Sequence, residues 1–514
     1  MASGFVIRKN QYYDSVFLMG VNKRLSQNQS VHQTAVLMGT EKNKQLLADI
    51  GIHGIQIDAA QPSDLIVAVI AETEQVVEAV LGNLDQALLA IEADTPRSHL
   101  QTFEDGLGGK PSANLAVLTI PGEYVCREAR KALEAGLNVF IFSSNVPIAE
   151  ELELKELASE RGLLVMGPDC GTSILAGIGI GFANIVRRGR IGAIGPSGTG
   201  LQEFTTQVHH AGHGISHAIG TGSHDLSDQI GGITTFGALK VLEEDPQTDV
   251  VAIIAKPPGA NTLMRLNERL MTYSKPIVAC FLGIPQGQVV SRGALLAART
   301  IDDAVLLAVQ CIDGPGVHPT IQLSEQERQL AAETRLHWSA NQQFLRGVLA
   351  GGTFCYQAQQ ILKDRGLLVH SNVPLTPEGK LQANDVSVRH TLLDMGDDVY
   401  TLGRPHPMID GTMRKQRILA EGRDPSVAVL LLDFILGYNA SEDPVGDLLD
   451  SVLQAKHTMQ TSGGQLAVVA SVCGTDGDPQ DLNLQRSLLE DAGVIVFQSS
   501  ARAALFCCEL LKPG

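Results

Sequence analysis

A glycine-rich turn that opens a helix is the feature that most constrains this chain. Residues 191–203 read I-G-A-I-G-P-S-G-T-G-L-Q-E, and Leu201, Phe204 and Val208 then recur at helical spacing. The turn Gly195–Gly200 therefore lies at a predicted helix N-terminus. There the first backbone N–H groups lack helical partners, and the helix dipole favours a bound anion. Glycine lets an anion reach those groups because no Cβ intervenes.

An ordinary strand-to-helix turn explains the same pattern equally well. Thr199 followed by Gln202 also predicts a capping box at this helix. A second copy of the pattern strengthens the anion-binding interpretation. Residues 346–353 read R-G-V-L-A-G-G-T and open another helical pattern, and both stretches follow an arginine, Arg190 or Arg346. We predict a site built between the two helix ends.

The composition and the alternation of strand and helix patterns predict an α/β fold with mainly parallel sheets. Of the 514 residues, 44% are hydrophobic, only 4% are aromatic and 52 are glycine. This profile is typical of parallel strands rich in Val, Ile and Leu that are buried on both faces. We expect three doubly wound, Rossmann- or flavodoxin-like domains at 1–186, 187–317 and 341–514, with a linker at 318–340 that contains one helix.

Each expected domain contains its own series of strands. In the first domain we expect one parallel sheet with strands at 5–8, 34–38, 64–70, 114–120, 138–142 and 163–166, and helices at 73–92, 123–135 and 149–161. The segment 94–113, rich in Gly, Ser and Pro, is expected to be a loop. Strands of the other domains are expected at 191–194, 217–219, 250–255, 276–281, 345–350, 391–393, 427–432, 466–471 and 494–497. Ligands are expected beyond the carboxyl ends of such strands.

Charge and cysteine content exclude several classes of function. The net charge of −17, from 39 basic and 56 acidic residues, argues against nucleic acid or an anionic membrane as the main partner. Because no apolar run reaches transmembrane length and no signal peptide is recognisable, we expect a cytoplasmic protein. The eight cysteines show no Cys-x-x-Cys spacing and are expected to be reduced. No metal site is expected, since the histidines do not pair with other ligands at suitable spacing.

One histidine in the last domain is a candidate for chemistry. His406 lies between two prolines, with Arg404 and Asp410 nearby in the sequence. In this position it is a candidate general acid or base. A hydrogen-bonding residue of a rigid loop is the alternative.

Several motifs together resemble the α subunit of succinyl-CoA synthetase. They read M-G-P-D-C-G-T at 166–172, G-P-S-G-T at 195–199, D-P-Q-T at 245–248 and K-P-I-V at 275–278, and the resemblance covers about 115–312. Residues 341–514, with A-G-G-T at 350–353 and L-L-D-M-G at 392–396, resemble the C-terminal domain of the β subunit. The whole chain is similar to FdrA-type proteins, which join both pieces in one polypeptide.

The resemblance implies a role for each domain and for the two turns. Residues 1–186 would be CoA-binding-like, and 187–317 and 341–514 would be α-like and β-like ligase domains. In the synthetase, two opposed helices hold a phosphoryl group in transit on a histidine. By this likeness, the residues that cradle the phosphoryl group would be Ser197, Gly198, Thr199 and Gly200 on one helix and Gly351, Gly352 and Thr353 on the other.

The sequence departs from the family pattern in three ways. The stretch that matches the family's phosphohistidine motif, Ser291–Leu295, reads S-R-G-A-L and contains no histidine. Where the family has the glutamate that orients this histidine, residues 255–259 read A-K-P-P-G, so a cation that attracts phosphate replaces a carboxylate. There is no ATP-grasp domain, and the N-terminal glycine turn for CoA phosphates is missing. Lys256 and Arg292 are expected to neutralise charge on the transferred group.

These observations favour an enzyme component for acyl or carbamoyl transfer. Its expected ligand is phosphate, an acyl phosphate or carbamoyl phosphate, with CoA left open. FdrA-type proteins are associated with oxamate carbamoyltransferase and act with partner subunits, and direct attack on carbamoyl phosphate needs no histidine relay. Two alternatives stay open: an acyl-CoA synthetase subunit whose nucleotide domain lies on another chain, and a non-catalytic scaffold subunit. The acceptor substrate and the oligomeric state, including a homo-oligomer, are left undecided.

Overall fold

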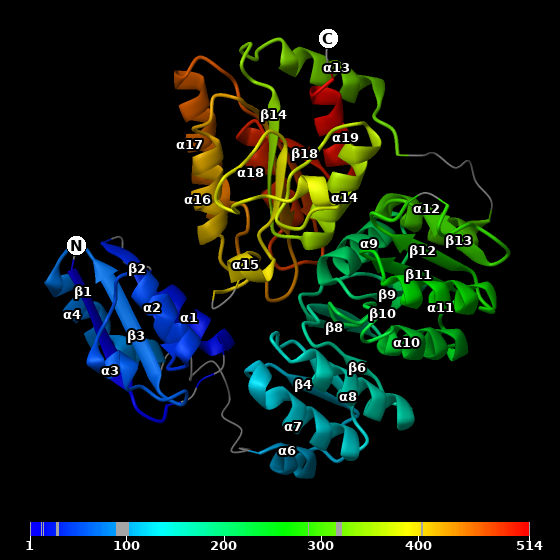
Figure 1. Ribbon diagram of the computed structural model, residues 1–514, viewed down its shortest axis with the longest axis horizontal. Helices are drawn as coiled ribbons and strands as arrows, with labels where there is room; N and C mark the ends of the chain where they lie inside the picture. The colour runs from blue at the N-terminus through cyan, green and yellow to red at the C-terminus, as the bar shows by residue number, and fades with distance from the viewer. Residues whose placement is uncertain are drawn as a thin grey trace. The chain divides into compact units, whose positions relative to one another are not determined.

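Aliphatic strands that are buried on both faces organise the largest sheet of the protein (Figure 1). The computed structural model describes residues 2–11, 13, 15–26, 30–88, 102–285, 287–314, 321–401 and 404–512. The chain divides into two compact units, of which the smaller comprises Met1–Ala113, Thr119–Pro121 and Gly403–Pro405, and the larger comprises the remainder. Each unit has a hydrophobic core of its own.

The largest sheet of the larger unit is doubly wound. Its elements are β7 (Thr172–Leu175), β8 (Ile178–Gly181), β9 (Arg188–Gly195), α9 (Gly198–His210), β10 (Ile215–Gly220), α10 (Ile233–Glu244), β11 (Val250–Ala255), α11 (Ala260–Met271), β12 (Ile277–Phe281), β13 (Leu295–Ala298) and α12 (Ile301–Asp313). Over the described residues the strand order is β13-β12-β11-β9-β10-β7-β8, and β9 to β13 run parallel. In β11, Ala252 and Ile254 pack with α9 and α12, whereas Val251 and Ile253 pack with α10 and α11.

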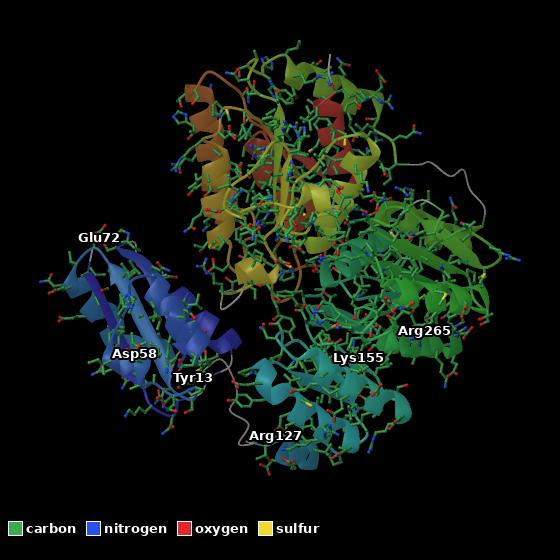
Figure 2. The ribbon with its side chains drawn as sticks, in the orientation of Figure 1. Tyr13, Asp58, Glu72, Arg127, Lys155 and Arg265 are labelled. Atoms are coloured by element: carbon green, nitrogen blue, oxygen red, sulfur yellow. The ribbon has the colours of Figure 1, made fainter. Side chains whose placement is uncertain are left out.

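A smaller parallel sheet precedes it in the chain. Its elements are β4 (Leu115–Leu118), α7 (Gly122–Glu134), β5 (Asn138–Ile141), α8 (Ile148–Glu160) and β6 (Val165–Met166), with strand order β4-β5-β6. Phe140 and Met166 share a hydrophobic cluster with Ile219 of β10, so this sheet packs against the largest one. Lys155 of α8, labelled in Figure 2, is fully buried.

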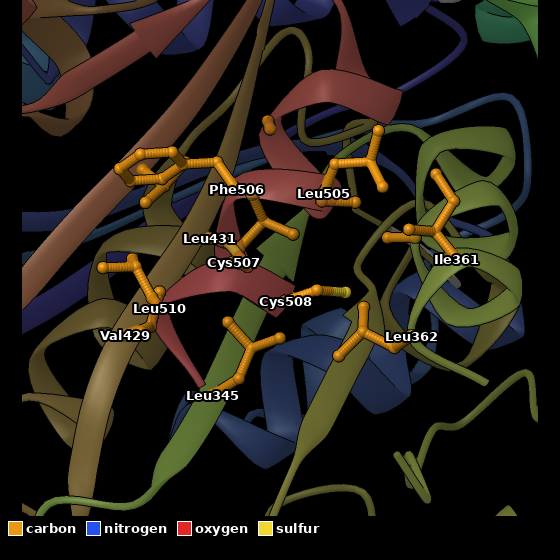
Figure 3. Packing of buried hydrophobic residues seen from close by; sticks show 14 of the residues in the cluster. Leu345, Ile361, Leu362, Val429, Leu431, Leu505, Phe506, Cys507, Cys508 and Leu510 are labelled. Atoms are coloured by element: carbon orange, nitrogen blue, oxygen red, sulfur yellow. The ribbon is translucent and has the colours of Figure 1, made fainter. Parts of the chain in front are cut away.

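The C-terminal sheet is parallel and is also covered on both faces. Its elements are α13 (Glu325–Arg335), β14 (Phe344–Leu349), α14 (Gly352–Asp364), the 3₁₀ turn η1 (Pro377–Gly379), β15 (Thr391–Asp394), α15 (Asp398–Thr401), α16 (Thr412–Glu421), β16 (Val427–Ile435), α17 (Gly446–Thr461), β17 (Ala467–Cys473), α18 (Leu482–Asp491), β18 (Ile495–Phe497) and α19 (Ser500–Leu510). The order is β15-β14-β16-β17-β18. Figure 3 shows Phe506 of α19 packed with Leu431 of β16. The opposite face packs against α16, α17 and α18. The expected α/β class with mainly parallel sheets is therefore confirmed.

The sheet of the smaller unit corrects one expectation. Its elements are β1 (Ala2–Arg8), α1 (Ser15–Leu25), β2 (Val31–Met38), α2 (Glu41–Asp49), α3 (Ile55–Asp58), β3 (Leu65–Ala71), α4 (Glu74–Gly82) and α6 (Phe103–Gly109). The strands at 5–8, 34–38 and 64–70 do not join the parallel sheet that follows, because β3 pairs antiparallel with both β1 and β2. In β3, Val67 and Val69 pack with α1 and α4, and Ile66 and Ala68 pack with α2 and α3. The expectation was wrong because a continuous apolar run indicates that a strand is buried on both faces, but it does not indicate the direction of the neighbouring strands.

Of the two segments expected between the sheets, the segment 94–113 differs from expectation and the linker does not. Within 94–113, residues 103–109 form α6, whose N-cap Thr102 accepts a hydrogen bond from the Asp105 N–H at 3.1 Å. Residues 94–101 lie outside the described residues. The same is true of residues 89–92, at the end of the expected helix 73–92, and of residues 315–320, around the start of the linker. The linker contains α13, as expected. Among the described helices, none combines the length and apolarity needed to span a bilayer.

The core of the C-terminal sheet gives a test of the fold. Phe506 is fully buried between α19 and the sheet. Phe506→Ala should lower the unfolding free energy by about 3–5 kcal/mol, because it removes buried apolar surface and leaves a cavity. Chemical denaturation of the full chain measures this change. Leu484→Ala on α18, where the side chain is 51% exposed, should change it by less than about 1 kcal/mol. Equal effects of the two substitutions would contradict this packing.

Candidate functional site

The N-termini of α9 and α14 meet in the larger unit. Their N-cap residues are Ser197 and Gly351, and neither helix start has a hydrogen bond from its N-cap side chain. Ser197 Oγ and Thr353 Oγ1 are hydrogen-bonded to each other. A Cβ added to Gly200 would lie 3.1 Å from Thr353 Cγ2, so glycine permits the close approach of the two helices. The structure therefore brings both predicted cradles together.

The predicted capping box at Thr199 is wrong. The helix begins at Gly198, two residues earlier than a capping box at Thr199 requires, so Ser197 is the N-cap and Thr199 is the second residue of the helix. Gln202 instead donates from Nε2 to Asn184 Oδ1 at 3.1 Å and to the Leu436 carbonyl at 3.3 Å. The first turn of α9 is consequently not closed by its own side chains, which leaves its N–H groups directed at the meeting point.

A loop from the first parallel sheet also reaches this meeting point. A Cβ on Gly198 would lie 2.8 Å from Thr172 Oγ1 and 3.3 Å from the Gly171 Cα. Thr172 in turn donates to the Phe182 carbonyl at 2.6 Å. The M-G-P-D-C-G-T motif at 166–172 therefore packs against the start of α9, which explains why that start must be glycine.

A buried carboxylate holds the turn that leads into α14. Asp433 accepts hydrogen bonds from the N–H groups of Ala350 at 2.8 Å and Gly351 at 2.7 Å. Arg414 forms an ion pair with the same carboxylate at 2.8 Å, and both side chains are buried. Asp433 was missed in the sequence, although an aspartate inside the apolar run of β16 was a signal for it. The turn is thus fixed before any ligand binds.

Lys256 follows β11 and lies beside the start of α14. Its Nζ is 3.7 Å from Asp394 Oδ2 and 4.9 Å from the centre of the Tyr356 ring, and 37% of the side chain is exposed. A Cβ on Gly352 would lie 3.0 Å from Lys256 Nζ and would clash with Asp394 Oδ2. Burial raises the pKa of Asp394 to about 6, although Lys256 opposes the shift. After Asp433, Asp394 is the second residue near the helix starts that is not among the predicted site residues.

His406 lies beside Gly396, in the loop that follows Asp394. Its Nε2 is 2.7 Å from the position that a Cβ on Gly396 would take, and its Nδ1 accepts a hydrogen bond from the Met408 N–H at 3.3 Å. Burial lowers the pKa of His406 to about 4, with a further contribution from Arg414. The imidazole is therefore neutral at pH 7 with its proton on Nε2, where it is a hydrogen-bond donor rather than a general acid.

Arg292 does not join the other candidates. It lies in an exposed turn and bridges to Leu295 at the start of β13. Leu295 pairs with Ile277, the first residue of β12, so Arg292 belongs to the amino edge of the parallel sheet. The first cradle follows the carboxyl end of β9, the second cradle follows that of β14, and Lys256 follows that of β11. Its assignment to the phosphate site is corrected, because a resemblance in sequence did not indicate which edge the loop occupies.

A hydrogen-bonded chain one turn further along locks α9 to α14. Ser500 donates to Glu203 from its N–H and from Oγ, each at 2.7 Å. Gln357 of α14 donates from Nε2 to Ser500 Oγ at 2.7 Å and accepts from the Ile301 N–H at 2.8 Å. Burial raises the pKa of Glu203 to about 8, and burial also raises the pKa of Asp302 beside it. These contacts set the spacing of the two helix starts.

Family models match three parts of the chain. The CoA-ligase model matches residues 348–507, the CoA binding domain model matches 186–283, and the model described as "AllF, heavy metal-associated domain" matches 1–102. The CoA binding domain model therefore matches residues that follow the segment 1–186, for which the resemblance predicts the CoA-binding likeness. Residues 1–102 contain no cysteine, so the thiolates that soft metals prefer are absent from them. No cluster of three or more metal-ligating side chains occurs among the described residues.

Similar proteins cover the chain to different extents. YahF of Escherichia coli (strain K12) is 39% identical over 516 residues, which span 100% of this chain and 99% of YahF. The α subunit of the ADP-forming succinate–CoA ligase of Methanothermobacter thermautotrophicus is 30% identical over 173 residues, 33% of this chain and 57% of the subunit. An ATP citrate lyase structure from Methanothrix soehngenii aligns with 80% of this chain and 83% of its own at 14% identity, but its TM-score of 0.36 is too low to carry an argument.

The buried Glu203 predicts a pH dependence of stability. Its pKa rises from 4.5 to about 8 on folding, so unfolding releases a proton between these values. The stability of the wild-type protein should therefore fall as pH increases through this range. Glu203→Gln should flatten the decline and raise the melting temperature above pH 8 by a few degrees. Melting curves across this range measure the effect, and Glu268→Gln on the exposed face of α11 should follow the wild type. A Glu203→Gln curve with the wild-type slope would count against the shift.

The crowded position of Gly352 predicts a second effect. Gly352→Ala should cost about 1–3 kcal/mol, because its Cβ would displace the Asp394 carboxylate beside Lys256. Gly82→Ala in α4, where a Cβ meets nothing within 4 Å, should be neutral or should stabilise by up to about 1 kcal/mol. The midpoints of denaturant unfolding compare the two variants. Tolerance of alanine at position 352 would show that the close contacts there are not maintained.

Proposed function

This chain belongs to the succinyl-CoA synthetase superfamily and to the same family as YahF, and on that premise we propose that it transfers an acyl or carbamoyl group from a phosphate carrier bound between α9 and α14. It is an acyl-CoA synthetase-like protein. The single observation that supports the ligand is the meeting of two helix N-termini without caps from their own N-cap side chains. Such helix ends favour phosphate through their N–H groups and their dipoles.

The phosphate group would enter where Ser197 and Thr353 now touch. The two hydroxyls are hydrogen-bonded to each other, so a ligand must separate them. Each hydroxyl can then donate to a phosphate oxygen, beside the N–H groups of Gly198 and Gly352. Lys256, with 37% of its side chain exposed, supplies the positive charge that offsets the dianion.

Direct transfer is the chemistry that these residues support best. The stretch Ser291–Leu295 lacks histidine and lies at the amino edge of the sheet, so it offers no phosphohistidine relay. Carbamoyl phosphate and acyl phosphates react instead by attack of a nucleophile on the carbonyl carbon, with phosphate as the leaving group. Neutral His406 can donate a hydrogen bond from Nε2 to the substrate. The acceptor expected from the resemblance is oxamate.

An acyl-CoA ligase subunit is the second candidate function. Residues 186–283 match the CoA binding domain model, and several relatives are named as α subunits of CoA ligases. The glycine turn 195–200 fits a phosphoryl group, which CoA also carries. In this case a partner chain would supply the nucleotide site. Incubation with radiolabelled ATP and analysis for alkali-stable phosphohistidine separates the two candidates, because only the ligase forms it.

Substitution of Lys256 tests the proposed transfer. Lys256→Ala should weaken carbamoyl-phosphate binding at least about tenfold, equivalent to about 1.4 kcal/mol, because it removes the cation beside the phosphate. The measurement is a thermal-shift titration with carbamoyl phosphate, phosphate, CoA, succinate and oxamate, since a ligand of the folded state raises the melting temperature. Lys240→Ala on the exposed side of α10 is the matched control. Unchanged binding and turnover in Lys256→Ala would remove the central residue from the proposal, and binding without turnover would favour the scaffold alternative.

A further inference from the structure

A half-exposed histidine follows β10 on the same edge of the sheet as Lys256. His224 Nδ1 lies 3.2 Å from Glu151 Oε2, and 51% of the His224 side chain is exposed. The hydrogen bond to Glu151 orients the ring and assigns its proton to Nδ1, so the Nε2 lone pair is available on the exposed side. The arrangement of an imidazole held by a buried carboxylate is the one that general bases in hydrolases and transferases use.

The carboxylate that orients His224 is itself firmly held. Glu151 and Lys155 are both fully buried on α8, and their charged atoms are 2.8 Å apart. Lys155 also forms an ion pair with Asp225 at 2.9 Å and donates to the Thr221 carbonyl at 3.0 Å. Asp225 accepts hydrogen bonds from backbone N–H groups at the start of α10. Burying the three charged side chains of Glu151, Lys155 and Asp225 is costly for stability. Holding the imidazole of His224 in one orientation is a functional reason for this buried cluster.

The histidine lies in the electrostatic environment of the proposed phosphate site. The loop that carries His224 packs against the segment that reaches the start of α9, because a Cβ on Gly222 would lie 2.7 Å from Gly167 Cα and a Cβ on Gly198 would lie 3.3 Å from Gly171 Cα. Lys256 in turn lies beside Asp394 and the first turn of α14. His224 and Lys256 therefore lie on the same edge of the sheet, after the carboxyl ends of the neighbouring parallel strands β10 and β11.

From this geometry we infer that His224 is the general base of the transfer reaction, oriented by Glu151. The inference rests on the proposed function. The nucleophile is the N–H of an amine or amide acceptor, and the donor is an acyl or carbamoyl phosphate. The nitrogen forms a bond to the carbonyl carbon, the bond from that carbon to the phosphate oxygen breaks, and phosphate leaves with the electron pair. His224 Nε2 takes the proton from nitrogen, and Glu151 stabilises the imidazolium that forms.

The surroundings of His224 give the expected pH dependence. The hydrogen bond to Glu151 raises the pKa of His224 above its ordinary value, burial opposes this shift, Asp169 adds to it and Lys155 opposes it. The rate should therefore rise with pH through the pKa of His224. Glu151→Gln removes the largest contribution, so the acid limb of kcat/KM should move to lower pH.

Turnover of carbamoyl phosphate by the full chain with any partner it needs tests this inference. His224→Asn should lower kcat about 100-fold or more, the usual contribution of a general base, while the thermal shift with carbamoyl phosphate stays near that of the wild type. His457→Asn, at an exposed position of α17, is the matched control. Turnover of His224→Asn within about threefold of the wild type would overturn the inference, because general bases contribute far more than that.

A second measurement does not depend on turnover. In a ¹³C-histidine-labelled full chain, the resonance missing from His224→Asn reports on this ring, and it should titrate at lower pH in Glu151→Gln. Saturating inorganic phosphate, verified by thermal shift, should move the same resonance. An unmoved resonance with phosphate bound would reject His224 as part of the site. The absence of any thermal shift with phosphate or carbamoyl phosphate would instead reject the proposed function.

Discussion

The contact between the starts of α9 and α14 is the interaction on which the architecture of the larger unit depends. Two helices from different sheets point their positive ends at each other, which is unfavourable unless something negative or polar lies between them. In this protein the Ser197 and Thr353 hydroxyls meet at that point, and Asp433 holds the turn before α14 with a buried carboxylate. The proposed binding of a phosphate carrier rests on this arrangement.

Polar side chains buried between the two parallel sheets keep the helices in place. Glu203, Ser500 and Gln357 form one continuous chain of hydrogen bonds. Asn184, between β8 and β9, donates to Asp478 at 2.7 Å and to the Leu436 carbonyl at 2.9 Å, which adds a second link to the C-terminal sheet. Buried polar groups of this kind are costly if a single partner is lost. They therefore define one relative position of the helix starts more sharply than an apolar interface would.

The charge distribution at the site is mixed rather than simply basic. Lys256 lies beside Asp394. Burial raises the pKa of Asp169, and the charges of His224 and Lys256 oppose this shift. Burial disfavours the charged form of both Asp394 and His406: it raises the pKa of Asp394 to about 6 and lowers the pKa of His406 to about 4. In the proposed transfer, this mixed site would bind a phosphate dianion without holding it too tightly for release.

The sequence by itself determined the secondary structure around the two glycine turns, the mainly parallel character of the later sheets and the position of residues 195–200 and 350–353 at helix N-termini. These follow from local rules: apolar periodicity, glycine where backbones approach, and helix starts that leave N–H groups open. Only the tertiary structure decided that β3 is antiparallel to its neighbours, that Arg292 lies at the opposite edge from the cradles, that Asp433 holds the turn before α14, and that Asp394 lies beside Lys256. Strand direction and contacts between residues far apart in the chain depend on how elements pack, and a single sequence records burial without recording partners.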